Sequence, residues 1–164
     1  MAVDSQQFKN VMAKWASGVT VVTTVHEGAW KGTTASSFSS VSLNPPTILV
    51  CLAQKLYTHK LFSESGVFAV NILSPAQLEV AKLFAGMYPD IEDRFAENSW
   101  QTAQTGSPIL EDGYGWLDCK IAQMVPAGDH TIFVGEVQSL GTFEGDDNPL
   151  MYFNRHWGTF TALE

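Results

Sequence analysis

Charged side chains are scarce in this sequence, and the few cations are scattered rather than gathered in a basic run. Only 16% of the residues are Asp, Glu, Lys or Arg, and the formal net charge is −8. Proteins that bind nucleic acid or an anionic membrane carry clustered Lys and Arg to meet the phosphates. The composition therefore argues against both partners. A surface so poor in charge also predicts that part of it is buried in an oligomer.

Cysteine and long apolar runs are scarce as well. The two cysteines, Cys51 and Cys119, lie far apart, each inside an expected strand, and Cys-x-x-Cys does not occur. This pattern is typical of reduced, buried thiols in a cytoplasmic protein. No apolar run approaches the roughly 18 residues that a membrane span needs, and the first seven residues have neither a basic flank nor an apolar core. The sequence thus predicts no signal peptide and no transmembrane segment.

Several catalytic signatures are missing too. The sequence contains no Gly-x-Ser-x-Gly, no Gly-x-x-x-x-Gly-Lys-Ser/Thr and no Gly-x-Gly-x-x-Gly. These absences argue against a hydrolase nucleophile elbow, a P-loop and a Rossmann dinucleotide site. The histidines are dispersed, at His26, His59, His130 and His156, so no metal site is predicted.

The most conspicuous feature that is present is a run of hydroxyls. Seven of the ten residues from 33 to 42 are Ser or Thr, and the run leads through Asn44-Pro45-Pro46 into an apolar segment. Hydroxyls and backbone N–H groups can together surround an anion or a cofactor without carrying charge. An exposed polar strand or turn would have the same composition, so residue chemistry alone leaves both interpretations open.

The hydrophobic pattern predicts three helices. The first begins at Asp4 or Ser5, ends before Gly18, and carries one apolar stripe formed by Phe8, Val11, Met12, Trp15 and Ala16. The second covers 57–64. The third follows Ser74 and Pro75, a favoured pairing at a helix start.

Most of the chain is expected to be strand. Strands are predicted over 19–25, 47–53 (buried), 67–73, 116–124, 130–137 and 150–153, with an extended segment over 31–43 and an irregular stretch over 86–113. This order lacks the strand–helix alternation of a parallel sheet. We expect a mainly β, antiparallel barrel with a few peripheral helices, formed by a single domain over residues 1–164.

Four further segments have two interpretations each. His130 is either a proton donor or ligand-positioning group, or a strand-end residue bonded to Asp129. The segment 55–60 places cations and a hydroxyl at a helix start, which is either a phosphate site or a solvated turn. Arg94 follows an acidic stretch, where a local ion pair is the default. Tyr152 and Trp157 either pack in a core or an interface, or stack on a planar ligand.

Five segments occur in an order and spacing that resemble a known family. They are 18–24 (GVTVVTT), 34–46 (TASSFSSVSLNPP), 68–73 (FAVNIL), 129–137 (DHTIFVGEV) and 149–152 (PLMY). From about Phe8 to Trp157, the chain is similar to flavin reductases of the flavin-binding split-barrel type. These are the small reductase components of two-component flavin monooxygenases.

The resemblance implies an antiparallel split β-barrel that forms a homodimer with flavin near the interface. It implies reduction of FMN or FAD by NADH or NADPH, and supply of the reduced flavin to a flavin-dependent oxygenase component. Two rival functions use the same barrel. One is an electron carrier that retains its flavin and reduces a protein or a metal chelate, and the other is a non-enzymatic flavin- or haem-binding module.

The resemblance also assigns roles to residues. It places the flavin against Thr34, Ala35, Ser36 and Ser37, with the strand at Cys51 and Leu52 passing the isoalloxazine ring. It places the phosphate side at Lys55 and Thr58, and the flavin tail near Phe84, Arg94 and Phe95. His130 corresponds to the nicotinamide side of the pocket, and Tyr152 to a further cofactor contact. The C-terminal segment departs from the family: residues 152–157 are YFNRHW, where relatives often have Tyr-Tyr-Arg-Gly-Arg-Tyr.

Overall fold

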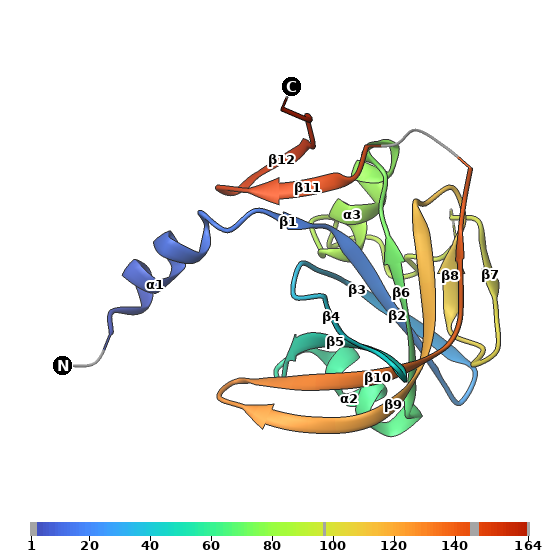
Figure 1. The fold of residues 1–164 in the computed structure, drawn as a ribbon. Coiled ribbons are helices and arrows are strands. Elements are labelled where there is room, and N and C mark those ends of the chain that lie inside the picture. The colour runs from blue at the N-terminus through green and yellow to red at the C-terminus, as the bar shows by residue number, and fades with distance from the viewer. Residues whose placement is uncertain (1–2, 97, 145–147, 164) are drawn as a thin grey trace.

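The body of the molecule is a seven-stranded antiparallel sheet. The computed structural model describes residues 3–96, 98–144 and 148–163. In spatial order the sheet contains β3 (Ala29–Ala35), β2 (Thr20–His26), β6 (Val67–Ile72), β9 (Gly115–Ala127), β10 (His130–Thr142), β5 (Pro46–Ala53) and β4 (Ser39–Leu43) (Figure 1). The expected mainly β, antiparallel fold is confirmed.

The two edges of this sheet meet without pairing. β3 is one edge strand and β4 is the other, yet only residues 36–38 separate them along the chain. The edges must therefore lie close together, and the absence of a ladder between them leaves the barrel split at this point. The hydroxyl-rich run forms the end of β3, the connection across the split, and β4. The segment 31–43, expected as one extended piece, thus belongs to two strands.

The strand β5 is buried mainly on one face, whereas β2 and β6 are buried on both. Along β5, Ile48, Val50 and Leu52 are buried, and the residues between them are half-buried. The strand expected over 47–53 is therefore confirmed, with its inner side chains in the core and every second side chain turned outward, as in a barrel. α2 (Tyr57–Ser65) closes one end of the barrel, with Phe62 fully buried against Phe68 and Phe133 at 5.8 Å between ring centroids.

The helix expected after Ser74 begins with a short 3-10 turn, η1 (Pro75–Gln77), and continues as α3 (Leu78–Phe84). Gln77 Oε1 accepts a hydrogen bond from the Ser74 backbone N–H at 3.2 Å, which fixes this start. α3 packs on β3 and, through Phe84, joins a second core cluster with Phe95 and Leu110.

Most of the short strands escaped prediction, because two to four residues carry no usable periodicity; the exception is the strand expected over 150–153, which is observed with these bounds. β7 (Trp100–Thr102) and β8 (Pro108–Leu110) pair inside the stretch expected to be irregular. β1 (Ser17–Gly18), β11 (Leu150–Phe153) and β12 (His156–Thr159) form a separate three-stranded sheet. β9 and β10 also extend beyond the expected 116–124 and 130–137, as a long hairpin.

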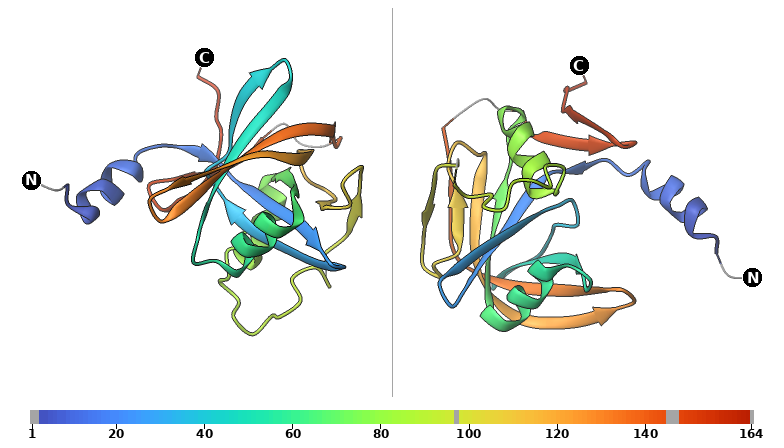
Figure 2. Two further views of the ribbon diagram at one scale, coloured as in Figure 1. Left: turned by 90° about the horizontal axis from the view of Figure 1, so that it is seen from below. Right: turned by 180° about the vertical axis from the view of Figure 1, so that it is seen from behind.

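α1 (Ser5–Met12) begins as expected, since Asp4 accepts hydrogen bonds from the backbone N–H groups of Gln6 and Gln7. None of its residues is buried, and it projects away from the barrel (Figures 1 and 2). Its apolar stripe therefore covers no part of its own chain's core. Within the described ranges, no helix has the length and apolar character needed to cross a membrane.

Candidate functional site

A cavity of about 420 Å³ opens at the split of the barrel. Its size is typical of small-molecule sites, which combine apolar walls with a few polar groups. The lining residues are Val19, Thr33, Thr34, Ala35, Ser36, Leu56, Ala85, Met87, Tyr152 and Trp157. The structure thus brings four of the sequence-predicted contacts together: Thr34, Ala35, Ser36 and Tyr152. Leu56, Ala85 and Met87 were missed, because a single apolar residue in a loop gives no signal in the sequence.

Two aromatic rings form one wall of this cavity. Tyr152 of β11 and Trp157 of β12 pack edge to face, with 5.0 Å between their ring centroids. The turn between them, Asn154-Arg155, has positive φ at both residues, as a two-residue hairpin requires. The altered C-terminal segment therefore still closes the cavity, with Trp157 as the second ring.

The hydroxyl groups of residues 34–37 differ in whether they are hydrogen-bonded to the protein. Thr34 Oγ1 donates to the Ala81 carbonyl at 2.6 Å, which ties β3 to α3. Ser37 Oγ donates to the Cys51 carbonyl at 2.7 Å and accepts from the Cys51 N–H at 3.2 Å. Ser36 is exposed. Thr34 therefore holds β3 to α3 and Ser37 holds the connection at the split to β5, whereas Ser36 is exposed and lines the cavity.

Three predicted contacts lie behind the cavity wall or beside it. The side chains of Leu52 and Phe84 are buried in the two core clusters, so they shape the wall rather than line it. Phe84 packs over Gly32 so closely that a Cβ there would lie 2.8 Å from its ring. Cys51 points outward and is half-buried, and burial raises the pKa of its thiol, which keeps it protonated and unreactive at neutral pH.

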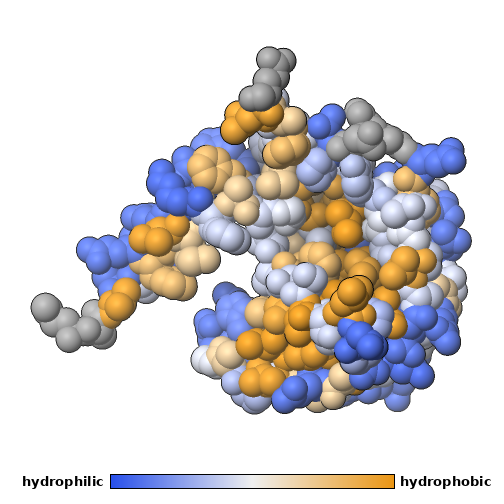
Figure 3. All heavy atoms as spheres, viewed as in Figure 1, coloured by the Kyte–Doolittle hydropathy of each residue, from blue (hydrophilic) through white to orange (hydrophobic). Residues whose placement is uncertain are grey.

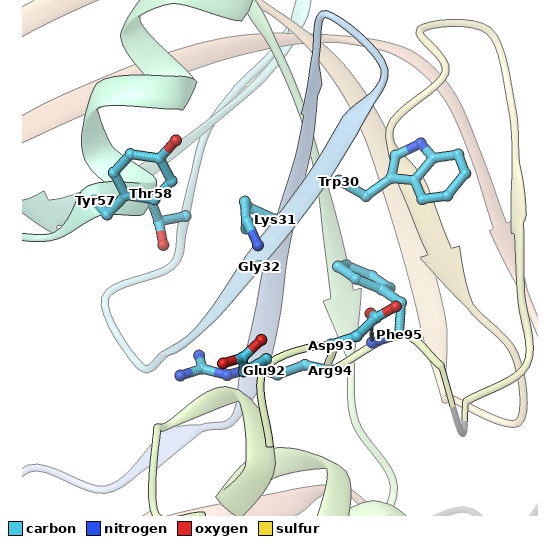
Figure 4. A pocket seen from close by; sticks show the side chains of 9 residues that line it. All are labelled: Trp30, Lys31, Gly32, Tyr57, Thr58, Glu92, Asp93, Arg94 and Phe95. Atoms are coloured by element: carbon cyan, nitrogen blue, oxygen red, sulfur yellow. Dashed lines mark hydrogen bonds between the residues drawn. The ribbon is translucent and has the colours of Figure 1, made fainter. Parts of the chain in front are cut away.

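A second cavity of about 230 Å³ is lined by Gly32 and Tyr57, whose chain neighbours Thr33 and Leu56 line the first. It lies between β3, the start of α2 and the loop 92–95 (Figure 4). The lining residues are Trp30, Lys31, Gly32, Tyr57, Thr58, Glu92, Asp93, Arg94 and Phe95. The predicted contacts Thr58, Arg94 and Phe95 therefore meet here.

Arg94 does not form the local ion pair expected from the acidic stretch before it. Its Nη1 donates to the Phe84 carbonyl at 3.2 Å, at the C-terminal end of α3, where a cation is favourable. Asp93 Oδ1 accepts from the Phe95 N–H at 2.9 Å instead. Across the described ranges no carboxylate lies within ion-pair distance of Arg94, and its guanidinium borders the second cavity.

His130 and Lys55 lie apart from both cavities, where the turn of the β9–β10 hairpin meets the turn after β5. His130 Nδ1 is 2.7 Å from Asp129 Oδ1, and this hydrogen bond is the main cause that lowers the pKa of Asp129. Gln54 Nε2 donates to the His130 carbonyl at 3.1 Å. The bond to Asp129 is the strand-end arrangement considered above. The role of His130 toward a nicotinamide stays a prediction.

The molecule is thus a small antiparallel β-barrel protein with a small-molecule cavity where the barrel is split. The chain belongs to the flavin reductase like domain family, whose model matches residues 12–161.

Named relatives agree with this assignment. The chain is 36% identical to the "FMN reductase (NADH) RutF" of Acinetobacter baylyi over 157 residues, which cover 96% of this chain and 82% of that protein. It is 32% identical over 163 residues to the "Flavin-dependent monooxygenase, reductase subunit HsaB" of Mycobacterium tuberculosis, with 99% and 84% covered. The structure of nitrilotriacetate monooxygenase component B from Mycobacterium thermoresistibile superposes with a TM-score of 0.91 at 32% identity, covering 96% of this chain and 87% of that one.

Proposed function

We propose that this protein reduces a flavin with NADH or NADPH and supplies the reduced flavin to a partner oxygenase. The observation that carries this proposal is the cavity at the split, where Thr34–Ser36 face Tyr152 and Trp157. A planar ring with a polar edge fits such a cavity, since aromatic and apolar walls take its faces and uncharged donors take its edge. The polar tail of the flavin would extend past Leu56 to Thr58 and Arg94 in the second cavity.

The residues present fit the chemistry of flavin reduction. A bound flavin supplies the hydride-accepting atom, and the nicotinamide supplies the hydride. The protein has to hold two rings face to face and exclude water between them. Negative charge gained by the ring on reduction is best met by fixed dipoles. Backbone N–H groups and the Ser36 hydroxyl at the split are suitable donors, and no strong acid or base is needed.

We further propose that the protein is a cytoplasmic homodimer. The apolar residues Phe8, Val11 and Met12 of α1, and Trp15 just after it, are between 48% and 72% exposed. In Figure 3 the surface is hollowed between α1 and the β9–β10 hairpin. Apolar residues gather on the part of the molecule that contains the hairpin. Exposed apolar surface of this extent is typical of a protein–protein interface, and a second copy is the simplest partner for it. The oxygenase could receive reduced flavin by diffusion.

Anaerobic mixing with NADH tests this function. We expect the protein, saturated with FMN or FAD, to bleach the flavin absorbance within seconds and to release reduced flavin that passes through a filtration membrane. Rapid bleaching with the flavin fully retained would favour the electron carrier. Bound flavin that is not bleached by NADH or NADPH would leave only the non-enzymatic binding module.

We expect His130→Ala to raise the KM for the nicotinamide roughly three- to tenfold and to retain part of the turnover, as the loss of one hydrogen bond worth about 0.5–1.5 kcal/mol would do. Steady-state kinetics with varied NADH measure this effect. His156→Ala is the matched control, because His156 is exposed on β12 and its Nδ1 lies 2.7 Å from the nearby Asn154 carbonyl oxygen. Kinetics of His130→Ala equal to those of the parent would remove His130 from the site.

A further inference from the structure

We propose that Met87 holds the bound flavin in the cavity at the split, and that Tyr88 and Glu79 are positioning residues that keep Met87 against the ligand. This inference rests on the proposed function, because it assumes that a flavin occupies this cavity. It goes further in that it names the residues that set how fast the flavin leaves. That rate matters for a protein that passes its reduced flavin to a partner.

Met87 is one of the apolar residues that line the cavity at the split. It follows α3, and Figures 1 and 2 show α3 beside β11, the strand that carries Tyr152. Met87 is 57% exposed, so more than half of it is free to be covered by a ligand. A long, unbranched thioether adapts its shape to a neighbouring surface, and apolar area removed from water stabilises a complex. Met87 is therefore suited to cover part of a planar ring in the cavity.

The backbone after α3 directs Met87 to the cavity. Gly86 has a φ of 79°, in the left-handed region that ends many helices. The Met87 N–H donates to the Lys82 carbonyl at 3.1 Å, which folds the chain back on α3. Ala85 and Met87, on either side of this glycine, both line the cavity. The turn thus fixes the backbone of Met87, whereas the thioether has no strong hydrogen-bonding group that could hold the side chain itself.

The residue after Met87 is tied back to α3 through its side chain. Tyr88 Oη donates to Glu79 Oε2, and Lys82 Nζ donates to Glu79 Oε1 at 2.6 Å. The bonds from Lys82 and Tyr88 lower the pKa of Glu79, so the carboxylate is charged at neutral pH and accepts a charge-assisted hydrogen bond. Met87 therefore lies between two attachments to the same helix, the glycine turn before it and the Tyr88–Glu79 bond after it. Loss of the second attachment should let Met87 move away from the cavity.

The Tyr88–Glu79 bond lies at the surface, where the Glu79 side chain is 67% exposed. Bonds between exposed polar side chains contribute little to the stability of the whole fold. Ala81 and Phe84 bury α3 in the second core cluster whether or not this bond forms. We therefore expect its removal to change the position of Met87 and to leave the fold intact.

The test measures the rate constant of flavin dissociation, from the change in flavin fluorescence after stopped-flow dilution of protein loaded with FMN or FAD. We expect Met87→Ala to raise this rate constant about tenfold, because the apolar cover is lost. Met87→Leu keeps the apolar bulk and should stay within about twofold of the parent. Tyr88→Phe and Glu79→Ala should each raise the rate constant about three- to fivefold. In all four variants, the rate constant of association should stay within about twofold of the parent's.

Two comparisons separate positioning from a general structural role. In the Met87→Ala background, Tyr88→Phe should change the dissociation rate constant by less than about twofold, because the side chain that Tyr88 positions is gone. Tyr114→Phe is the matched control, because it removes the same hydroxyl from a tyrosine that lines neither cavity. This control should change neither rate constant. Thermal unfolding midpoints close to the parent's establish that the variants are folded.

Different failures of this test have different meanings. If Met87→Ala releases flavin at the parent's rate while NADH still reduces the flavin, the inference is overturned and the proposed function stands. If Tyr88→Phe has no effect in the parent, or the same effect with and without Met87, the positioning role is overturned. If neither FMN nor FAD binds to the parent, the proposed function fails together with the inference.

Discussion

Gly135→Ala should lower the free energy of unfolding by about 3 kcal/mol, at the upper end of what overpacking a core costs. Gly135 lies in β10, beside a register shift, where the ladder to β9 is irregular. A Cβ at this position would lie 2.5 Å from Phe68 Cζ and 3.1 Å from the Cβ of Cys119. Phe68 is fully buried between Phe62 and the strands, so its ring cannot move aside without opening the barrel core. Denaturant unfolding followed by tryptophan fluorescence measures the loss.

A double-mutant cycle assigns the loss to this one contact. Phe68→Leu shortens the side chain that the new methyl group would strike, so Gly135→Ala should cost far less in that background than in the parent. Gly158→Ala on β12 is the control, because nothing lies within 4 Å of the Cβ it would add. Strictly additive effects of Gly135→Ala and Phe68→Leu would show that the glycine is required for another reason.

The barrel was predictable wherever a strand is long and apolar on its inner face. β2, β5 and β6 were expected within about one residue of their observed ends, and α2 was expected one residue short. Gly135 lies in the segment 129–137, one of the five that resemble the family. The structure explains why a glycine occupies this position. The glycine makes room for Phe68, a constraint between strands distant in sequence. No local pattern could reveal it.

The sequence could predict which segment lies at the candidate site, but not the contacts that its residues make. The hydroxyl-rich run does cross the split of the barrel, as a cofactor cradle would. Its sequence could not show that Thr34 bonds to Ala81 and Ser37 to Cys51, because these partners come from a helix and a strand folded against it. Likewise, the α1 stripe has a core-facing pattern but faces solvent. Periodicity shows that one face of a helix is apolar, but it does not show what packs against that face.

Asn71→Leu should be the most destabilising change of a polar side chain, with a loss of about 3–4 kcal/mol. Asn71 is 2% exposed. Its Oδ1 accepts from the Leu110 N–H at 2.7 Å and its Nδ2 donates to the Val21 carbonyl at 3.1 Å. Leucine has nearly the same volume but would leave the Leu110 N–H without its acceptor, at about 1–3 kcal/mol for an unsatisfied buried group, and would also remove the bond to the Val21 carbonyl, worth about 0.5–1.5 kcal/mol. Asn10→Leu on the exposed face of α1 is the control and should cost little.

Asn71→Asp separates the two halves of this network. The carboxylate would keep the acceptor for Leu110 but would face the Val21 carbonyl with no proton to donate. Burial raises the pKa of such a carboxyl in the folded state, so the stabilising, protonated form is fully present only below the unfolded pKa and is lost as the pH rises. The variant should therefore lose less stability relative to the parent at about pH 4 than at about pH 7. A deficit independent of pH would mean that the introduced carboxyl has the same pKa in the folded and unfolded states, and would contradict its burial in this network. Leu110 shares a core cluster with Phe84 and Phe95, which support the two cavities, so Asn71→Asp should also weaken flavin binding most at about pH 7.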